Sequence, residues 1–189
     1  MKKIIFLSLT IILFTSFSVS AQNSSLFNLV LVGEVSYNIY DGFYRDDNTS
    51  SYDEYDIGSG FGVRAGGQYW FDKELALETG VDMANIRGDK SSLFGPYGFL
   101  VHKAVDFLSI KGGFAYYFLD FINEASYGHS LGYLYGGNYH YSLTKNTDFT
   151  LSTYYRSSLV DMKKKYGNDI DASLNMSGLS FSAGINFKF

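Results

Sequence analysis

Apolar and polar residues alternate with a period of two along much of the chain, and the alternation is clearest at its end. The last nine residues place Phe181, Ala183, Ile185, Phe187 and Phe189 in alternation with Ser182, Gly184, Asn186 and Lys188. Such a segment forms a strand with one apolar and one polar face. Sheet proteins in water seldom end a strand on an exposed Phe, so this ending already separates the chain from most soluble sheets.

The same alternation, read between turn signals, predicts eight strands, each long enough to cross a thin bilayer at a tilt. Their spans are 29 to 40, 57 to 71, 74 to 86, 97 to 105, 109 to 119, 131 to 143, 148 to 159 and 174 to 189. Short connections at Asp72-Lys73, Asp106 to Leu108 and Thr144 to Thr147 alternate with longer polar ones at 41–56, 87–96, 120–130 and 160–173. An even number of strands agrees with closure, so we predict an all-β, eight-stranded antiparallel up-and-down transmembrane β-barrel with both termini at the short-turn end.

The two faces of the predicted strands differ in chemistry. The outward sets are apolar: Leu31, Val35, Tyr37 and Ile39; Phe61, Val63, Ala65, Tyr69 and Phe71; Leu75, Leu77, Val81 and Met83; Phe114, Tyr116 and Phe118. The opposite positions are small, polar or charged, a composition that suits a barrel lumen and cannot form a soluble core. The alternation does not show which side chains of strand 97–105 point outward. Aromatic groups near strand ends predict two interfacial girdles: Trp70-Phe71, Tyr116-Tyr117-Phe118, Tyr154-Tyr155 and Phe187 to Phe189.

The N-terminus is typical of a secretory signal peptide. Lys2 and Lys3 precede an apolar run of about 14 residues, shorter than the roughly 20 that a spanning helix needs, and small residues follow as far as Ala21. We expect residues 1–21 to be cleaved and 22–189 to form one barrel domain. The chain has no Cys, which excludes a lipid-anchored lipoprotein, disulfides and thiolate metal sites. Cleavage would take the net charge from −4 to −6, which gives no support to nucleic-acid binding.

Six charged residues on different strands are predicted to point into the lumen. They are Glu34, Arg64, Glu78, Asp82, Lys111 and Arg156. An eight-stranded barrel is only wide enough for side chains to fill, and an unpaired charge there would be costly. We therefore expect an ion-pair network that plugs the barrel, with Arg64 between Glu34 and Glu78. Water filling the lumen and solvating each charge is the alternative. The glycines of residues 58–67 would make room for large lumenal side chains such as Arg64.

The sequence contains few residue patterns that suggest catalysis or metal binding. His140 and Ser142 share a strand face, but they are expected in the lumen near a short turn, with no evident carboxylate partner. His129-Ser130 lies in a predicted outer loop. The carboxylates of loop 41–56 lack the spacing of a calcium loop. We expect no catalytic, cofactor-binding or metal residues.

Loop 41–56 is instead a candidate recognition surface, because aromatic and acidic groups interleave in it. Its candidate residues are Phe43, Tyr44, Asp46, Asp47, Tyr52, Asp53 and Tyr55. A cationic or carbohydrate partner would suit this surface. The Lys163-Lys164-Lys165 run would pair with the loop or with lipopolysaccharide.

The leader, the strand count and the terminal aromatic strand together resemble the small bacterial outer-membrane β-barrel family typified by OmpX and the OmpA transmembrane domain. In that family the barrel assembly machinery reads a C-terminal aromatic with apolar residues at every second position before it, which here are Phe181, Ala183, Ile185, Phe187 and Phe189. The resemblance implies the cell outer membrane, with lipid, lipopolysaccharide, assembly machinery and periplasmic chaperones as partners, and a monomer. We expect a structural or surface-binding role. A narrow or gated solute pore, a lipid-modifying enzyme and a role in secretion or envelope assembly remain as alternatives.

Overall fold

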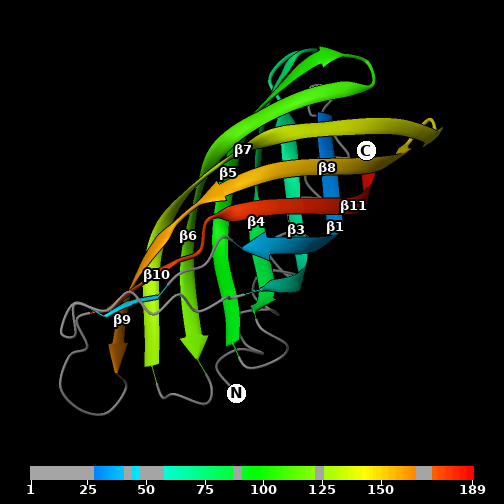
Figure 1. Cartoon of the computed structure of the whole chain (residues 1–189). Coiled ribbons are helices and arrows are strands. Elements are labelled where there is room, and N and C mark those ends of the chain that lie inside the picture. Colours follow the sequence, from blue (N-terminus) through cyan, green and yellow to red (C-terminus); the bar gives the residue numbers. More distant parts are fainter. Residues whose placement is uncertain (1–27, 41–43, 47–57, 87–90, 122–125, 165–171) are drawn as a thin grey trace, which may run out of the picture.

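The computed structural model describes residues 28–40, 44–46, 58–86, 91–121, 126–164 and 172–189. These residues are almost entirely strand (Figure 1). The elements are β1 (Asn28–Tyr40), β2 (Tyr44–Asp46), β3 (Ser59–Trp70), β4 (Leu75–Ile86), β5 (Ser91–Val105), β6 (Leu108–Phe121), β7 (Ser126–Thr144), β8 (Thr147–Ser157), β9 (Leu159–Lys164), β10 (Ala172–Asn175) and β11 (Gly178–Lys188). Among them, no helix has the length and apolarity needed to cross a membrane.

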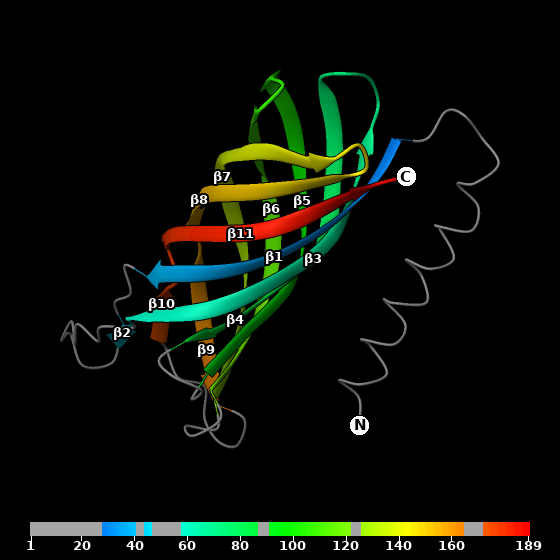
Figure 2. The same ribbon diagram turned by 90° about the vertical axis from the view of Figure 1, so that its right-hand side faces the viewer.

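Every strand pairs antiparallel with its neighbours, and the sheet closes on itself. The order runs β7-β6-β5-β4-β3-β1-β11-β8, and a β8–β7 pairing completes the barrel. β9 continues β8 after Ser158, and two residues separate β10 from β11. Counted as continuous strands, these segments form an eight-stranded barrel. The predicted closure of the last strand on the first is confirmed by eleven paired positions from Val30↔Lys188 to Tyr40↔Gly178. Figure 2 shows β11, β1 and β3 side by side along this seam.

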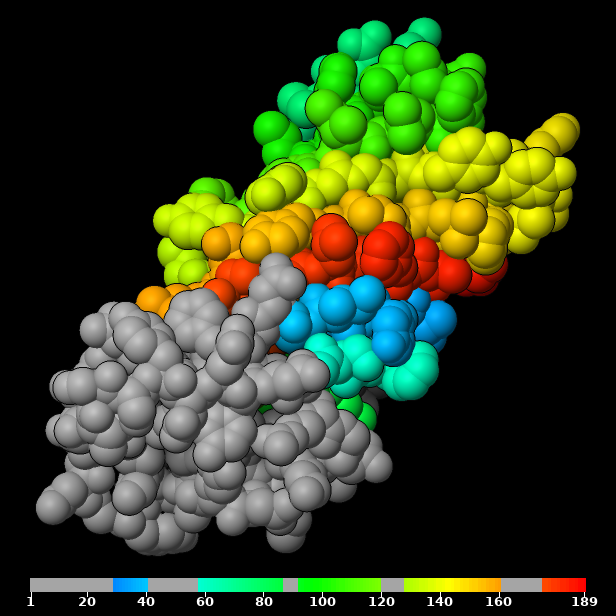
Figure 3. Space-filling model, in the orientation of Figure 1, coloured from blue at the N-terminus to red at the C-terminus, as the bar shows by residue number. Residues whose placement is uncertain are grey.

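The barrel is apolar outside and buries charged and polar side chains inside, the reverse of a soluble protein. Large apolar side chains such as Phe61 (73% exposed) and Val35 (62% exposed) face outward, whereas Arg64 and Glu34 are buried. Figure 3 shows the side chains of β8, β11 and β1 as adjacent bands across this outer surface. Such a surface is stable against lipid and unfavourable against water, so the chain has the surface of a membrane-spanning barrel.

The strands extend further than the sequence predicted at the end opposite the short turns. β5 begins at Ser91, β7 begins at Ser126, and β9 and β10 occupy much of the predicted loop 160–173. There β7 pairs with β9, β9 with β10, and β10 with β2. Polar strand residues carry no lipid-facing alternation once they leave the bilayer, which is why the sequence pattern assigned them to loops.

The structure shows which side chains of the fourth barrel strand, β5, face the lumen. Phe99 and Val101 are buried in the lumen, and Leu100 and His102 are exposed outside. His102 faces outward near the short-turn end, so the polar residue that obscured the alternation does not point into the lumen.

Candidate functional site: the barrel lumen

Glu34 is the centre of the lumenal charges. It lies directly opposite Arg64 on the neighbouring strand, and its carboxylate is 3.4 Å from the Arg64 guanidinium and 3.9 Å from Lys111 Nζ. Ser152 and Ser182 donate hydrogen bonds of 2.9 Å and 3.0 Å to its two oxygens. These four partners come from four different strands, so one carboxylate joins distant parts of the barrel wall.

Asp82 is a second centre, on β4. It faces Arg64 across the β3–β4 pair at 3.8 Å and accepts a 2.9 Å ion-pair contact from Arg156, which reaches across the lumen from β8. The Tyr117 hydroxyl donates to Asp82 at 3.0 Å and accepts from Arg156 Nε at 3.0 Å. The described contacts therefore link β1, β3, β4, β6 and β8 into one lumenal ion network.

The expected contact between Arg64 and Glu78 is wrong. Glu78 lies opposite Gln68, whose amide donates to it at 2.7 Å, and Asp82 takes the position opposite Arg64. Glu78 is four residues from Asp82 along β4, about 13 Å away.

The β3–β4 turn contains three residues, Asp72 to Glu74, one more than predicted. This length sets the pairing register of β3 and β4. Phe71 N donates to Leu75 O at 2.9 Å, while the Asp72 carboxylate accepts from the backbone N–H groups of Glu74 (2.7 Å) and Leu75 (2.8 Å). These backbone donors also hold the pKa of Asp72 below its ordinary value.

Aromatic rings surround the lumenal cations. The Arg64 guanidinium lies 4.2 Å from the Tyr154 ring centre and 4.9 Å from that of Tyr97, and Arg156 lies 4.6 Å from that of Tyr117. Such contacts stabilise a desolvated cation by about 2 kcal/mol. Tyr117 and Tyr154 were predicted in the outer girdles, and this is wrong for both. Each is the inward member of a Tyr pair, whose partner, Tyr116 or Tyr155, takes the opposite face.

Two glycines make room for one of these rings. Gly66 and Gly80 pair across β3 and β4, and a Cβ on either would lie 2.4 Å or 2.8 Å from the Tyr97 hydroxyl. The predicted use of lumenal glycines holds, although the side chain that they accommodate is Tyr97, which in turn supports Arg64.

An apolar layer that the period-two pattern did not predict lies in the lumen at the end opposite the short turns. These side chains, called here the outer apolar layer, are at most 5% exposed: Tyr40, Ile86, Leu93, Leu119, Val160 and Met176. Most of them lie at strand ends, where the period-two pattern is interrupted, and this hid their inward direction. This packed apolar layer lies next to the lumenal ion network.

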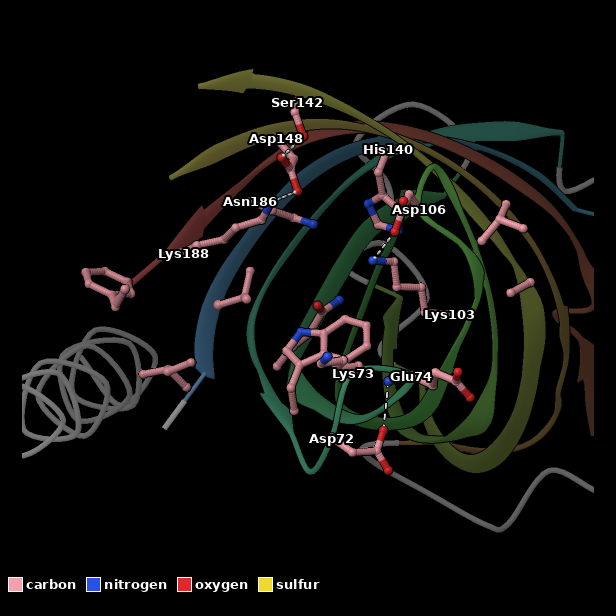
Figure 4. A pocket seen from close by; sticks show the side chains of 17 residues that line it. Asp72, Lys73, Glu74, Lys103, Asp106, His140, Ser142, Asp148, Asn186 and Lys188 are labelled. Atoms are coloured by element: carbon pink, nitrogen blue, oxygen red, sulfur yellow. Dashed lines mark hydrogen bonds and ion pairs between the residues drawn. The ribbon is translucent and has the colours of Figure 1, made fainter. Parts of the chain in front are cut away.

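The short-turn end is hollow instead. A cavity of about 770 Å³, called here the vestibule, opens at this end (Figure 4). Its walls include Trp70, predicted in a girdle but turned into this cavity, together with Gln68, His140 and Asn186. Two ion pairs lie at its rim, Lys103–Asp106 at 2.8 Å and Lys188–Asp148 at 2.5 Å.

The histidine and serine candidates do not form a catalytic group. His140 Nε2 contacts Ser109 Oγ at 2.9 Å and Nδ1 contacts Thr150 Oγ1 at 3.4 Å, whereas Ser142 donates to Asp148 at 2.8 Å. Within the described residues, therefore, no Ser, His and carboxylate are linked in the order that acyl transfer requires.

His129 does not contact Ser130 in a catalytic arrangement either. Its ring stacks on Tyr116 on the outer face with centroids 5.8 Å apart, while Ser130 faces inward. Among the described residues, no group of three or more His, Cys, Asp or Glu could hold a metal ion.

The other candidate residues lie away from the lumen. Phe181, Phe187 and Phe189 are exposed on the outer face, with Ala183 and Ile185 half-exposed beside them. The loop candidates Phe43, Asp47, Tyr52, Asp53 and Tyr55 fall outside the described residues. For Tyr44 and Asp46, only the backbone of β2 is described.

The fold is similar to that of known outer-membrane proteins. No family model matches the sequence, and no curated protein matches it either. The structure is similar to that of the outer membrane protein OprG from Pseudomonas aeruginosa, with a TM-score of 0.52 and 11% identity over 86% of this chain and 96% of that chain. It is also similar to Ail, the attachment invasion locus protein of Yersinia pestis (TM-score 0.49, 12% identity, 86% and 99% covered). A third similar structure is Neisserial surface protein A (TM-score 0.48, 15% identity, 85% and 97% covered). The chain thus has the fold of the small eight-stranded outer-membrane β-barrels, and at these identities the likeness concerns the fold alone.

Proposed function

We propose that this protein is a monomeric, integral outer-membrane barrel with a sealed lumen, exported through a signal peptide at residues 1–21. Its role is structural or surface-binding, through the loops that face the cell exterior, and it is neither an enzyme nor a solute channel. The short-turn end, with the vestibule, faces the periplasm in this proposal. Lipid, lipopolysaccharide, periplasmic chaperones and the assembly machinery, which would read Phe181 to Phe189, are its general partners.

The observation that carries the proposal is the filling of the lumen. Three carboxylates and three cations, all at most 4% exposed, occupy its middle: Glu34, Glu78, Asp82, Arg64, Lys111 and Arg156. Their charges sum to zero, so the network needs no counter-ion from solution. The outer apolar layer covers this network on the side of the loops. A transported solute would have to disrupt both the ion network and the outer apolar layer.

A swelling assay on liposomes tests the seal. Vesicles that hold the purified protein should swell in arabinose or glycine no faster than empty vesicles. A variant with Leu93→Gly, Leu119→Gly and Leu134→Gly, which removes three large lumenal side chains, should swell faster if it still folds. Rapid swelling with the unaltered protein would favour the narrow or gated pore.

The surface-binding role rests on the strands that continue beyond the bilayer. β9 and β10 extend the wall at the loop end, and β10 pairs with β2, which is part of loop 41–56. We expect cells that display the protein to bind cationic or glycan-coated surfaces, and replacement of Phe43, Tyr44, Tyr52 and Tyr55 by Ala to reduce this binding. Equal binding by cells that display the variant would remove the loop from the proposal.

A further inference from the structure

The vestibule has the size of a small-molecule site. Ligand pockets commonly measure about 300–1,000 Å³, and the vestibule measures about 770 Å³. Its walls come from β1, β3, β5, β7, β8 and β11, so the rigid barrel determines its shape. Unlike the middle of the lumen, it opens to the solvent at the short-turn end.

The vestibule is lined by uncharged polar side chains and by seven charged ones, three Lys and four carboxylates, from the turns and strand ends. Gln68, His140, Ser142 and Asn186 contribute amide, imidazole and hydroxyl groups. Asn186 is 3% exposed, and its buried Oδ1 has no hydrogen-bond partner among the described residues. Figure 4 shows its side chain directed into the cavity. A small rotation of the Asn186 side chain would bring this oxygen to the cavity surface, where a ligand can supply the missing hydrogen bond.

Two of the vestibule's three lysines form ion pairs within the protein, and the third, Lys73, lies between Asp72 and Glu74 in the β3–β4 turn. Lys188 is bound to Asp148 and Lys103 to Asp106, on separate parts of the rim. An ionic ligand would have to compete with these pairs, whereas a neutral ligand would leave them intact.

Trp70 supplies a large aromatic surface in the same cavity, with Leu29, Val30 and Phe189 nearby. A pyranose ring presents C–H groups that pack on an aromatic ring, and hydroxyl groups around its edge that both donate and accept. Uncharged amides matched with one aromatic ring therefore suit a sugar better than an ion or a purely apolar molecule.

We propose that the vestibule is a binding site for a neutral carbohydrate that reaches it from the short-turn side, with Trp70 as the stacking surface and Asn186 as a hydrogen-bonding anchor. The site is separate from the loops of the proposed function, so either can fail without the other.

Trp70 is the only Trp of the chain, so its fluorescence reports on the vestibule directly. The full protein, folded in detergent micelles, would be titrated with maltotriose and with triacetylchitotriose. We expect a saturable change in emission and protection of Trp70 from quenching by acrylamide. Asn186→Leu should weaken binding about tenfold, the equivalent of one lost hydrogen bond, and Asn85→Ala, an exposed position far along β4, should leave it unchanged.

Trialanine and phosphate serve as competing ligand classes in the same titration. No saturable response to either sugar up to tens of millimolar, tighter binding of trialanine or phosphate, or equal binding by a folded Asn186→Leu variant would each overturn the proposal. If Asn186→Leu does not fold, acrylamide quenching of the unaltered protein tests the proposal instead. A bound sugar must shield Trp70, so unchanged quenching at saturating sugar would overturn the proposal.

Discussion

Removal of the Asp82 carboxylate tests the lumenal ion network most sharply. Asp82 is 2% exposed, and its loss would leave Arg156, 2.9 Å away, and Arg64, 3.8 Å away, with one excess positive charge between them. The Tyr117 hydroxyl would also lose its 3.0 Å acceptor. Breaking a buried ion pair from one side costs about 3–5 kcal/mol, and almost no solvent is present to reduce this cost. We expect Asp82→Ala to lower the free energy of unfolding by about 4 kcal/mol.

The assay is reversible urea unfolding in lipid vesicles, followed by heat-modifiable gel mobility. With a slope near 2 kcal/mol per molar urea, the midpoint should fall by about 2 M. The double variant Asp82→Leu/Arg156→Met restores a neutral lumen and should lose less stability than Asp82→Ala. Asp106→Asn is the control, because Asp106 is 97% exposed and should not shift the midpoint. A loss below about 1 kcal/mol for Asp82→Ala would mean that water solvates the charges separately, and would refute the network.

Three further predictions concern other parts of the barrel. Gly80→Ala places a Cβ 2.2 Å from Ala65 O and should cost about 1–3 kcal/mol in the same unfolding assay. Gly98→Ala, with no neighbour within 4 Å of its Cβ, should be nearly neutral, and equal costs would contradict the close approach of β3 and β4 at Gly80. Because its folded-state pKa is depressed, Asp72 stabilises the β3–β4 turn above its ordinary pKa of 3.8, and this contribution is lost as the pH falls through the lower folded value. Carboxyl NMR should therefore give a midpoint below 3.8 in the folded protein and a higher one in urea. Deletion of Phe189 should reduce the heat-modifiable protein recovered from outer membranes, whereas Phe107→Ala, at another exposed Phe of the short-turn end, should not. Unchanged recovery of the Phe189 deletion variant would remove the assembly role.

The lipid-facing half of the barrel could be predicted from sequence because lipid requires an unbroken apolar surface. Apolar residues such as Val35, Phe61 and Phe181 occupy every second position of their strands, and a one-residue shift would expose a charge to lipid. The strand count, the closure and the inward direction of Glu34 and Arg64 all follow from that requirement.

The lumen could be predicted only in outline. Arg64 lies opposite Asp82 because the β3–β4 turn has three residues. A two-residue turn would put the outward Val81 opposite Arg64, and Glu78 would reach that position only after a shift of four residues. The inward direction of Tyr117 and Tyr154 was hidden because each adjoins an outward Tyr, and both faces of the barrel accept tyrosine. The vestibule had no signal in the sequence, because its residues come from the ends of six strands.

Conductance across a planar lipid bilayer tests the sealed lumen most directly. The intact protein, with its ion network and outer apolar layer in place, should insert without producing stable channels at any voltage that the bilayer tolerates. Reproducible unitary steps of nanosiemens size from the unaltered protein would contradict the sealed barrel.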